Sequence, residues 1–135
     1  MSQHATGPFD VKLAPLDPAF KTEDHAIGRM SIDKQYHGDL EATGKGEMLT
    51  AGSPAKGSGG YVAMEQVSGS LHGRSGTFAL QHSGTMQNGA FQLEVKVVPG
   101  SGTGQLAGLS GSMNIIIAAG GAHSYDLTYS LPDSK

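Results

Sequence analysis

The sequence predicts an all-β protein, an eight-stranded antiparallel β-barrel. Apolar and polar residues alternate in eight segments, as they do in half-buried strands. Turn-forming residues separate these segments at regular intervals, and no segment of useful length has helical periodicity. Glycine supplies 21 of the 135 residues. That is about twice its usual share of roughly 7%, and it suits a fold with many tight turns and bulges.

The eight strands are predicted at 9–13, 29–34, 38–49, 61–73, 76–84, 91–98, 112–118 and 123–131. The third is the weakest, because Gly44 and Gly46 interrupt its alternation. Two longer segments, 14–28 and 50–60, are rich in Pro, Gly and charge and are predicted to be surface loops. No internal repeat or domain boundary is found, so we expect a single domain over 1–135.

The last strand shows which side chains face the barrel interior. Its polar face is Ser124, Asp126, Thr128 and Ser130, which is expected to face solvent. The opposite face is therefore inward, and it carries His123, Tyr125, Leu127, Tyr129 and Leu131. The same alternation directs Phe91, Leu93, Val95 and Val97 inward from the sixth strand.

Two strands are apolar on both faces. Ile115, Ile116 and Ile117 follow one another, and Val62 and Met64 lie opposite an equally apolar face. A strand of this kind needs cover on both sides, and no helix is predicted to supply it. We therefore expect a homo-oligomer, most simply a dimer.

Composition limits the classes of partner. The net charge is −3 with both signs interspersed, so no basic stripe is available for nucleic acid or an anionic membrane. The longest apolar run, at 115–119, is too short to span a bilayer. The first ten residues lack the features of a signal peptide, and cysteine is absent. We expect a soluble, cytoplasmic protein.

Two glycine motifs look like nucleotide sites. "GTGQLA" at 102–107 fits the dinucleotide fingerprint, but more glycines and a strand follow it in place of the helix that the pyrophosphate requires. "GDLEATGK" at 38–45 is one residue too long for a phosphate loop. Both are predicted to be structural, and we expect no cofactor.

The chemically informative residues are Glu65 and His82. His82 ends an inward face that begins with Phe78 and Leu80, and Glu65 shares an inward face with Tyr61 on the preceding strand. A buried carboxylate needs a partner, so we predict that His82 contacts Glu65 inside the barrel. Arg74, Tyr125 and Tyr129 are the other candidate partners, and Lys34 is in phase to join them or to reach out at the rim.

The six histidines show no metal-binding spacing. His82 and His123 could share a metal ion with Glu65, but spacing alone does not specify one, and no metal is predicted. The candidate ligand-binding residues are Tyr61, Tyr125, Tyr129, His123, Phe78, Arg74 and Lys34. Arg74 is either a surface residue in a turn or a carboxylate clamp at the barrel mouth.

A small eight-stranded barrel is either filled or able to hold one small ligand. Three functions follow. The first is a barrel that binds a compact, largely apolar ligand. The second is a cofactor-independent isomerase, cyclase or lyase, with Glu65 as base and His82 as acid or orienting residue. The third is a filled structural barrel without a ligand.

Several stretches resemble known families. "GSGTGQLAGLSGSMNI" (100–115) is similar to the glycine-rich motif of allene oxide cyclases and dirigent proteins. "GRMSIDKQYHGDLEATGKGEML", "GYVAMEQVSGSLHGRSGTFALQHSGTM" and "HSYDLTYSL" resemble an uncharacterised bacterial family, known as a domain of unknown function, whose members form an allene-oxide-cyclase-like barrel. This resemblance implies a barrel over about 6–131. It implies no cyclase activity, because no catalytic residue of the cyclases can be carried over.

Overall fold

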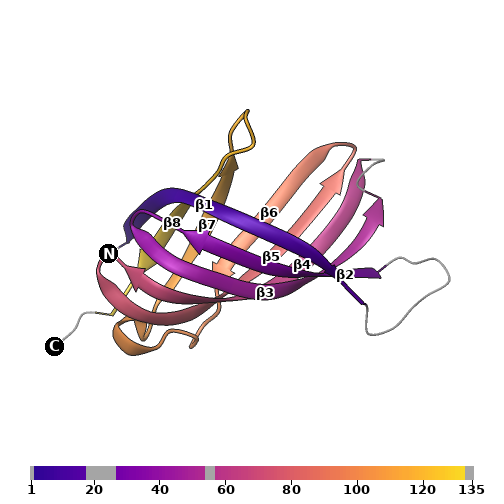
Figure 1. The fold of residues 1–135 in the computed structure, drawn as a ribbon. Coiled ribbons are helices and arrows are strands. Elements are labelled where there is room, and N and C mark those ends of the chain that lie inside the picture. Colours follow the sequence, from indigo (N-terminus) through magenta and orange to yellow (C-terminus); the bar gives the residue numbers. More distant parts are fainter. Residues whose placement is uncertain (1, 18–26, 54–56, 133–135) are drawn as a thin grey trace.

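The computed structural model describes residues 2–17, 27–53 and 57–132. Within these ranges the chain forms a closed barrel in which each strand pairs with its neighbours in sequence (Figure 1). The strands are β1 (Gln3–Leu16), β2 (Ile27–Tyr36), β3 (Leu40–Ser53), β4 (Ser58–Leu71), β5 (Arg74–Gln87), β6 (Ala90–Val97), β7 (Ser110–Ile117) and β8 (His123–Ser130). All pairs are antiparallel, so the predicted fold class is confirmed.

Most strands are longer than predicted. β1 and β2 remain paired as far as Leu16 and Arg29, and β3 and β4 as far as Ser53 and Ser58. The predicted loops therefore lose residues to strands at both ends, while 18–26 and 54–56 lie outside the described residues. The prediction was wrong there because the ends are rich in Pro, Gly and Ala, which weaken the alternation without preventing backbone pairing.

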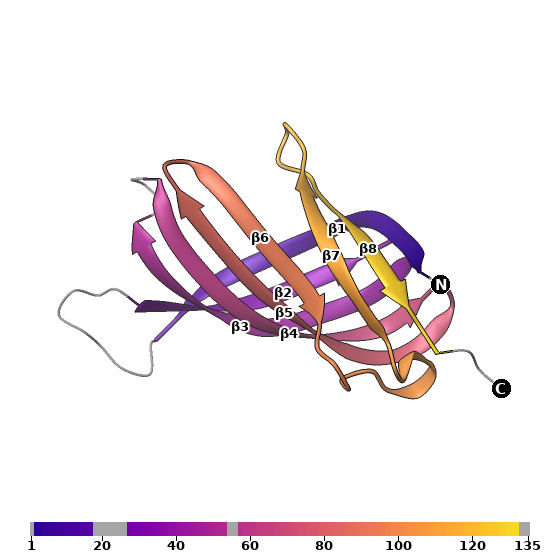
Figure 2. The ribbon, with the colours of Figure 1, turned by 180° about the vertical axis from the view of Figure 1, so that it is seen from behind.

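One end of the barrel is closed by the connection between β6 and β7. This segment, at the lower edge of Figure 2, lies beside the first half of β5, where the Thr103 amide donates to the Thr77 carbonyl, and contains a short 3₁₀ turn, η2 (Gly104–Leu106). Leu106 and Leu109 are buried in it. A Cβ atom on Gly102 would lie 2.0 Å from the Leu106 carbonyl oxygen, so the tight packing requires glycine. The "GTGQLA" motif is thus a structural turn, as predicted, because a strand and no helix follows it.

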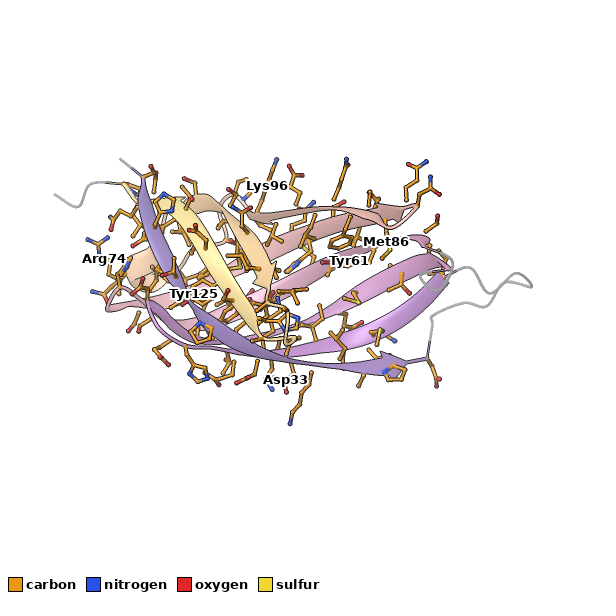
Figure 3. The ribbon with its side chains drawn as sticks, turned by 90° about the horizontal axis from the view of Figure 1, so that it is seen from above. Asp33, Tyr61, Arg74, Met86, Lys96 and Tyr125 are labelled. Atoms are coloured by element: carbon orange, nitrogen blue, oxygen red, sulfur yellow. The ribbon has the colours of Figure 1, made fainter. Side chains whose placement is uncertain are left out.

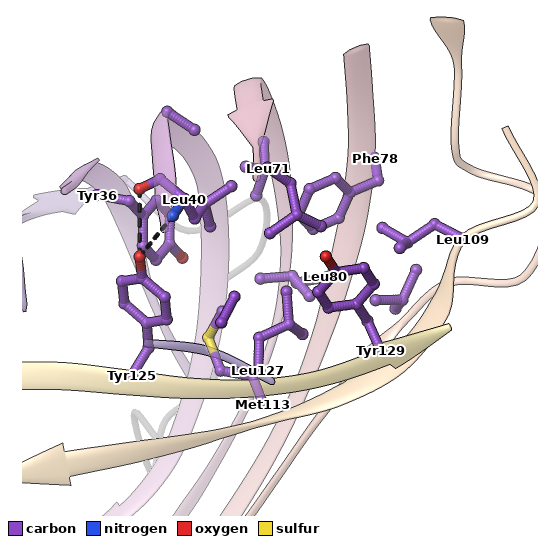
Figure 4. Close-up of a cluster of buried hydrophobic side chains, with 14 of the residues drawn as sticks. Tyr36, Leu40, Leu71, Phe78, Leu80, Leu109, Met113, Tyr125, Leu127 and Tyr129 are labelled. Carbon is purple, nitrogen blue, oxygen red and sulfur yellow. Dashed lines mark hydrogen bonds between the residues drawn. The ribbon is translucent and has the colours of Figure 1, made fainter. Parts of the chain in front are cut away.

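The half of the interior next to this closed end is a packed apolar core. Figure 4 shows side chains from most strands meeting there, and they include Tyr36, Leu40, Leu71, Phe78, Leu80, Leu109, Met113, Tyr125, Leu127 and Tyr129. Each of these side chains is at most 3% exposed. The inward face predicted for β8 is confirmed here. Side chains of the barrel itself therefore pack this half.

The other half opens to solvent. β6 and β7 pair only at Val95–Met113 and Lys96–Ser112 and then diverge, as Figure 2 shows. Three inward apolar side chains remain exposed at this end, Leu13 at 47%, Phe91 at 54% and Ile117 at 62%. Phe91 has the predicted phase but is not buried, because β7 no longer covers it.

Val62 and Met64, which suggested an oligomer, lie on the outer surface, and Leu49 lies opposite Val62 on the adjacent strand. Leu49, Val62 and Met64 on β3 and β4 are 48%, 52% and 54% exposed, and a hollow of about 450 Å³ lies beside Leu49 and Val62. Ile116, on β7, is 51% exposed on a separate part of the barrel. In the part of the chain that the structure describes, no helix is long and apolar enough to cross a membrane.

The homo-oligomer remains a prediction, and a substitution at Val62 tests it. Val62→Lys should leave the single barrel stable, because the side chain is half exposed, but it should place a charge within any interface built on this face. We expect the wild type to be an oligomer and the variant a monomer by size-exclusion chromatography with light scattering. Gln66→Lys, at another outward position of β4, is the control. A monomeric wild type at micromolar concentration contradicts the prediction.

Candidate functional site

The open half of the barrel contains a cavity of about 160 Å³. Its polar lining residues are Lys34, Tyr61, His82 and His123, and the other walls are mostly apolar, with Val11, Ile32, Leu93 and Ile115 among them. A cavity of about 150 Å³ is large enough to hold a benzene molecule. A second, apolar pocket of about 160 Å³ adjoins it towards the rim and shares Met48, Tyr61 and Phe91 with it. Side chains therefore do not fill the interior of this half.

Behind one wall of the cavity, Glu65 is the centre of a buried polar cluster. Its side chain is 0% exposed, and Oε1 lies 3.0 Å from Lys34 Nζ and 2.9 Å from His82 Nε2. Tyr36 donates a hydrogen bond of 2.5 Å to Oε2. The predicted contact between His82 and Glu65 is confirmed, and Lys34 joins the cluster instead of reaching solvent.

The contact between His82 and Glu65 is diagonal. In the ladder between β4 and β5, His82 lies opposite Ala63, and Glu65 lies opposite Leu80. Diagonal neighbours on one sheet face are about 7–8 Å apart, within reach of long side chains. Both residues are long enough to bridge this separation, so alternation on adjacent strands was sufficient to pair them.

The cluster keeps Glu65 ionised. Burial raises the pKa of Glu65, but the hydrogen bond from His82, the charge of Lys34 and the hydrogen bond from Tyr36 together lower that pKa below its usual value. Burial and the Glu65 charge raise the pKa of Tyr36 well above its usual value. Glu65 is therefore a carboxylate that only accepts hydrogen bonds, and Tyr36 is a permanent donor.

Lys34 is held between the carboxylate and two rings. Its ammonium lies 5.1 Å from the centre of the Phe9 ring and 5.6 Å from that of Tyr36, within the range of cation–π attraction. Its side chain is 6% exposed. The carboxylate and the ring faces replace the water that the ammonium group has lost on burial.

Tyr36 is the site residue that sequence reasoning missed. It continues the inward series Met30, Ile32, Lys34 by one more step, which was the available signal. The predicted strand ends at residue 34, two residues too early to include Tyr36. Its hydroxyl contact to Glu65 is the shortest in the cluster.

Tyr61 and His123 border the cavity, as expected of ligand-binding residues. The centre of the Tyr61 ring lies 6.4 Å from that of His82. Its position depends on Gly84, because a Cβ atom there would lie 2.7 Å from Tyr61 Cε1. The His123 ring packs against Phe9 with their centres 5.3 Å apart.

Four predicted ligand-binding residues do not border this cavity. Tyr125 accepts a hydrogen bond from the Leu40 amide (Figure 4). It also donates one to the His37 carbonyl, and the two bonds tie β8 to the turn between β2 and β3. Tyr129 contacts His72 near the closed end, and Phe78 belongs to the packed core. Arg74 is exposed at the end of the barrel away from Tyr61 (Figure 3). Arg74 is therefore not a clamp at the open mouth, and neither Tyr125 nor Tyr129 contacts Glu65 through a hydrogen bond.

The residues that could share a metal ion by the sequence are His82, His123 and Glu65. No three His, Cys, Asp or Glu side chains within the described ranges are grouped so that they could hold a metal ion. His123 contacts the Phe9 ring, whereas Glu65 is bound by Lys34, Tyr36 and His82.

Gly44 provides the space that the Glu65 side chain occupies. A Cβ atom at Gly44 would lie 2.0 Å from Glu65 Oε2 and 3.1 Å from Tyr36 Cε2. Gly44→Ala should therefore displace the carboxylate and lower the free energy of unfolding by about 1–3 kcal/mol, measured by urea denaturation. Gly120→Ala is the matched control, since nothing lies within 4 Å of its Cβ position. Equal stability of the two variants contradicts this packing.

The lowered pKa of Glu65 predicts a pH-dependent stability. Because the folded pKa lies below the unfolded value of about 4.3, the contribution of Glu65 is fully present above that pH and is lost as pH falls through the folded pKa. The difference in unfolding free energy between the wild type and Glu65→Gln should shrink as the pH falls below about 4.3. Denaturant melts at pH values from 7 to 3 measure this difference in unfolding free energy. A difference that does not shrink in acid contradicts the assignment.

Comparisons with known proteins identify the family. The model of the family described as "Protein of unknown function (DUF3224)" matches residues 5–129. The crystal structure of a protein with unknown function from this family, from Shewanella oneidensis MR-1, is 45% identical and has a TM-score of 0.91, with 99% of this chain and 100% of that chain covered. No curated protein matches the sequence. The family resemblance expected from the sequence is thereby confirmed, and the chain belongs to the DUF3224 family of proteins of unknown function.

Proposed function

We propose that this protein is a small-molecule binding barrel whose ligand is compact and largely apolar with one polar end. The observation that carries the proposal is the cavity of about 160 Å³, which has Lys34 and His82 in an otherwise mostly apolar lining. Ligand sites typically combine apolar walls with a few placed polar groups. A barrel filled throughout its length would leave no such space.

The two pockets suggest how the ligand lies. Its polar end belongs beside Lys34 and His82, and its apolar part extends past Tyr61 towards Met48 and Phe91, which border both pockets. Glu65 already balances the charge of Lys34, so a neutral hydroxyl or carbonyl group suits the site better than a second charge. The resemblance to allene oxide cyclases remains a prediction and does not contribute to this proposal.

Phenol and toluene form a suitable pair of probes, because they share a ring and differ in the hydroxyl group. Titrations followed by protein NMR should show saturable binding of both, with phenol tighter by roughly 2- to 12-fold, the effect of one net hydrogen bond of about 0.5–1.5 kcal/mol. The shifted resonances should belong to residues of the cavity, including Leu93 and Ile115.

Two variants test whether the probes bind inside the barrel. Leu93→Trp should fill the cavity and abolish binding, whereas Leu49→Trp, on the outer face of β3, should leave it unchanged. Binding that survives Leu93→Trp, or that responds to Leu49→Trp, contradicts a site inside the barrel. A wild type that binds neither probe contradicts the proposal itself.

A further inference from the structure

His82 uses only one of its two ring nitrogens to contact the protein. Nε2 lies 2.9 Å from Glu65 Oε1, and over the described residues nothing bonds to Nδ1. In the same part of the chain, no completely buried side-chain nitrogen or oxygen lacks a partner. Nδ1 is therefore not sealed within protein. The open space that His82 borders is the cavity, although its side chain is only 3% exposed.

Glu65 decides which nitrogen of a neutral His82 carries the proton. An ionised carboxylate can only accept hydrogen bonds, so Nε2 must be the N–H donor. The neutral ring then has its lone pair at Nδ1. When His82 is neutral, its unprotonated nitrogen is therefore Nδ1.

We propose that His82 Nδ1 is a general base that removes a proton from the carbon next to the carbonyl group of a compact apolar ligand, which makes the barrel a cofactor-independent isomerase of such carbonyl compounds. This inference rests on the proposed binding function, since the substrate must enter the cavity. The proposal exchanges the roles that the sequence suggested for Glu65 and His82. Glu65, already bonded to three side chains, becomes the positioning residue, and His82 moves the proton.

The proton shift needs no further reactant. Nδ1 takes the α-proton, the C–H electron pair forms a C=C bond, and the carbonyl π pair moves onto oxygen to give an enolate. The imidazolium that results is held at Nε2–H by the Glu65 carboxylate. Nδ1 then returns the same proton to a different carbon of an unsaturated enolate, which restores the carbonyl group and the neutral histidine.

Lys34 is placed to stabilise the enolate oxygen. Its ammonium has three N–H groups, of which one contacts Glu65 at 3.0 Å and another has a long contact of 3.4 Å to Tyr36. The side chain lines the same cavity as His82. A preorganised cation at a developing oxyanion is a frequent source of rate enhancement in enzymes.

Deuterium exchange tests whether His82 acts as a base. In D₂O, ¹H NMR follows the replacement of the α-protons of cyclohexanone by deuterium. The exchange rate with the wild type should exceed that with His82→Gln by about 100-fold or more, the range of positioned general bases. His37→Gln is the control. It changes an exposed histidine in the turn between β2 and β3, so its exchange rate should match that of the wild type. Glu65→Gln should slow the exchange while cyclohexanone still binds, because an amide does not stabilise the imidazolium. Circular dichroism checks that each variant is folded.

Separate outcomes test the base and the binding function. Ligand-observed NMR on the same samples measures whether cyclohexanone binds. Binding without faster exchange overturns the base and leaves the binding function standing, while no binding overturns both. ¹⁵N spectra of the wild type test the base without any variant. At the pH where His82 is neutral, they should show the proton on Nε2, and a proton on Nδ1 overturns the proposal.

Discussion

Glu65→Leu is expected to destabilise the protein by about 3–5 kcal/mol, because it leaves a buried charge without its partner. Lys34, which is only 6% exposed, would face a leucine in place of a carboxylate. Tyr36 and His82 would lose the acceptor of their hydrogen bonds. The free energy of unfolding in urea measures this loss. It should be among the largest effects of any single substitution in the barrel.

Two variants separate the lost charge from the lost volume. Glu65→Gln retains an acceptor oxygen and should cost less than Glu65→Leu. The double variant Lys34→Met, Glu65→Leu removes both charges and should lose less than the sum of the single losses, because the two residues share one contact. Glu94→Gln, at an exposed carboxylate on β6, should be neutral. Additive losses at Lys34 and Glu65 would show that the two side chains do not interact.

Leu106→Ala is the second change expected to have a large effect. Leu106 is 1% exposed in the segment that closes the barrel between β6 and β7. Removing its side chain leaves a cavity at the closed end and should lower the free energy of unfolding by about 2–5 kcal/mol. The change is far from Lys34 and His82, so phenol binding should be unaffected.

Leu49→Ala makes the same chemical change at a position that is 48% exposed, and it serves as the control for Leu106→Ala. Its effect should be small, because the leucine side chain is already half in water. If both variants unfold at the same urea concentration as the wild type, the glycine-rich segment does not close the barrel as described.

The alternation of side chains was enough to predict the inward faces. It paired His82 with Glu65 and placed Lys34 in phase with them, because in a closed barrel every inward residue of adjacent strands shares one interior. The fold class followed from the same pattern and from the turn residues between the strands.

Alternation does not show how deep a side chain lies along the barrel. His123 and Tyr125 share one face of β8, yet His123 borders the cavity and Tyr125 is in the packed core. Depth depends on how the strands are staggered, which the period of two residues does not encode. For the same reason Tyr129, Phe78 and Arg74 could be given a face or a turn but not a distance from Glu65.

A crystal structure of the protein with 4-bromophenol tests most directly whether the polar cluster serves a ligand site. The anomalous signal of bromine locates the probe without ambiguity. We expect the hydroxyl oxygen within hydrogen-bonding distance of His82 Nδ1 and the bromine in the apolar pocket beside Met48 and Phe91. Bromine only on the outer face of the barrel, or a cavity filled by its own side chains, contradicts the ligand site.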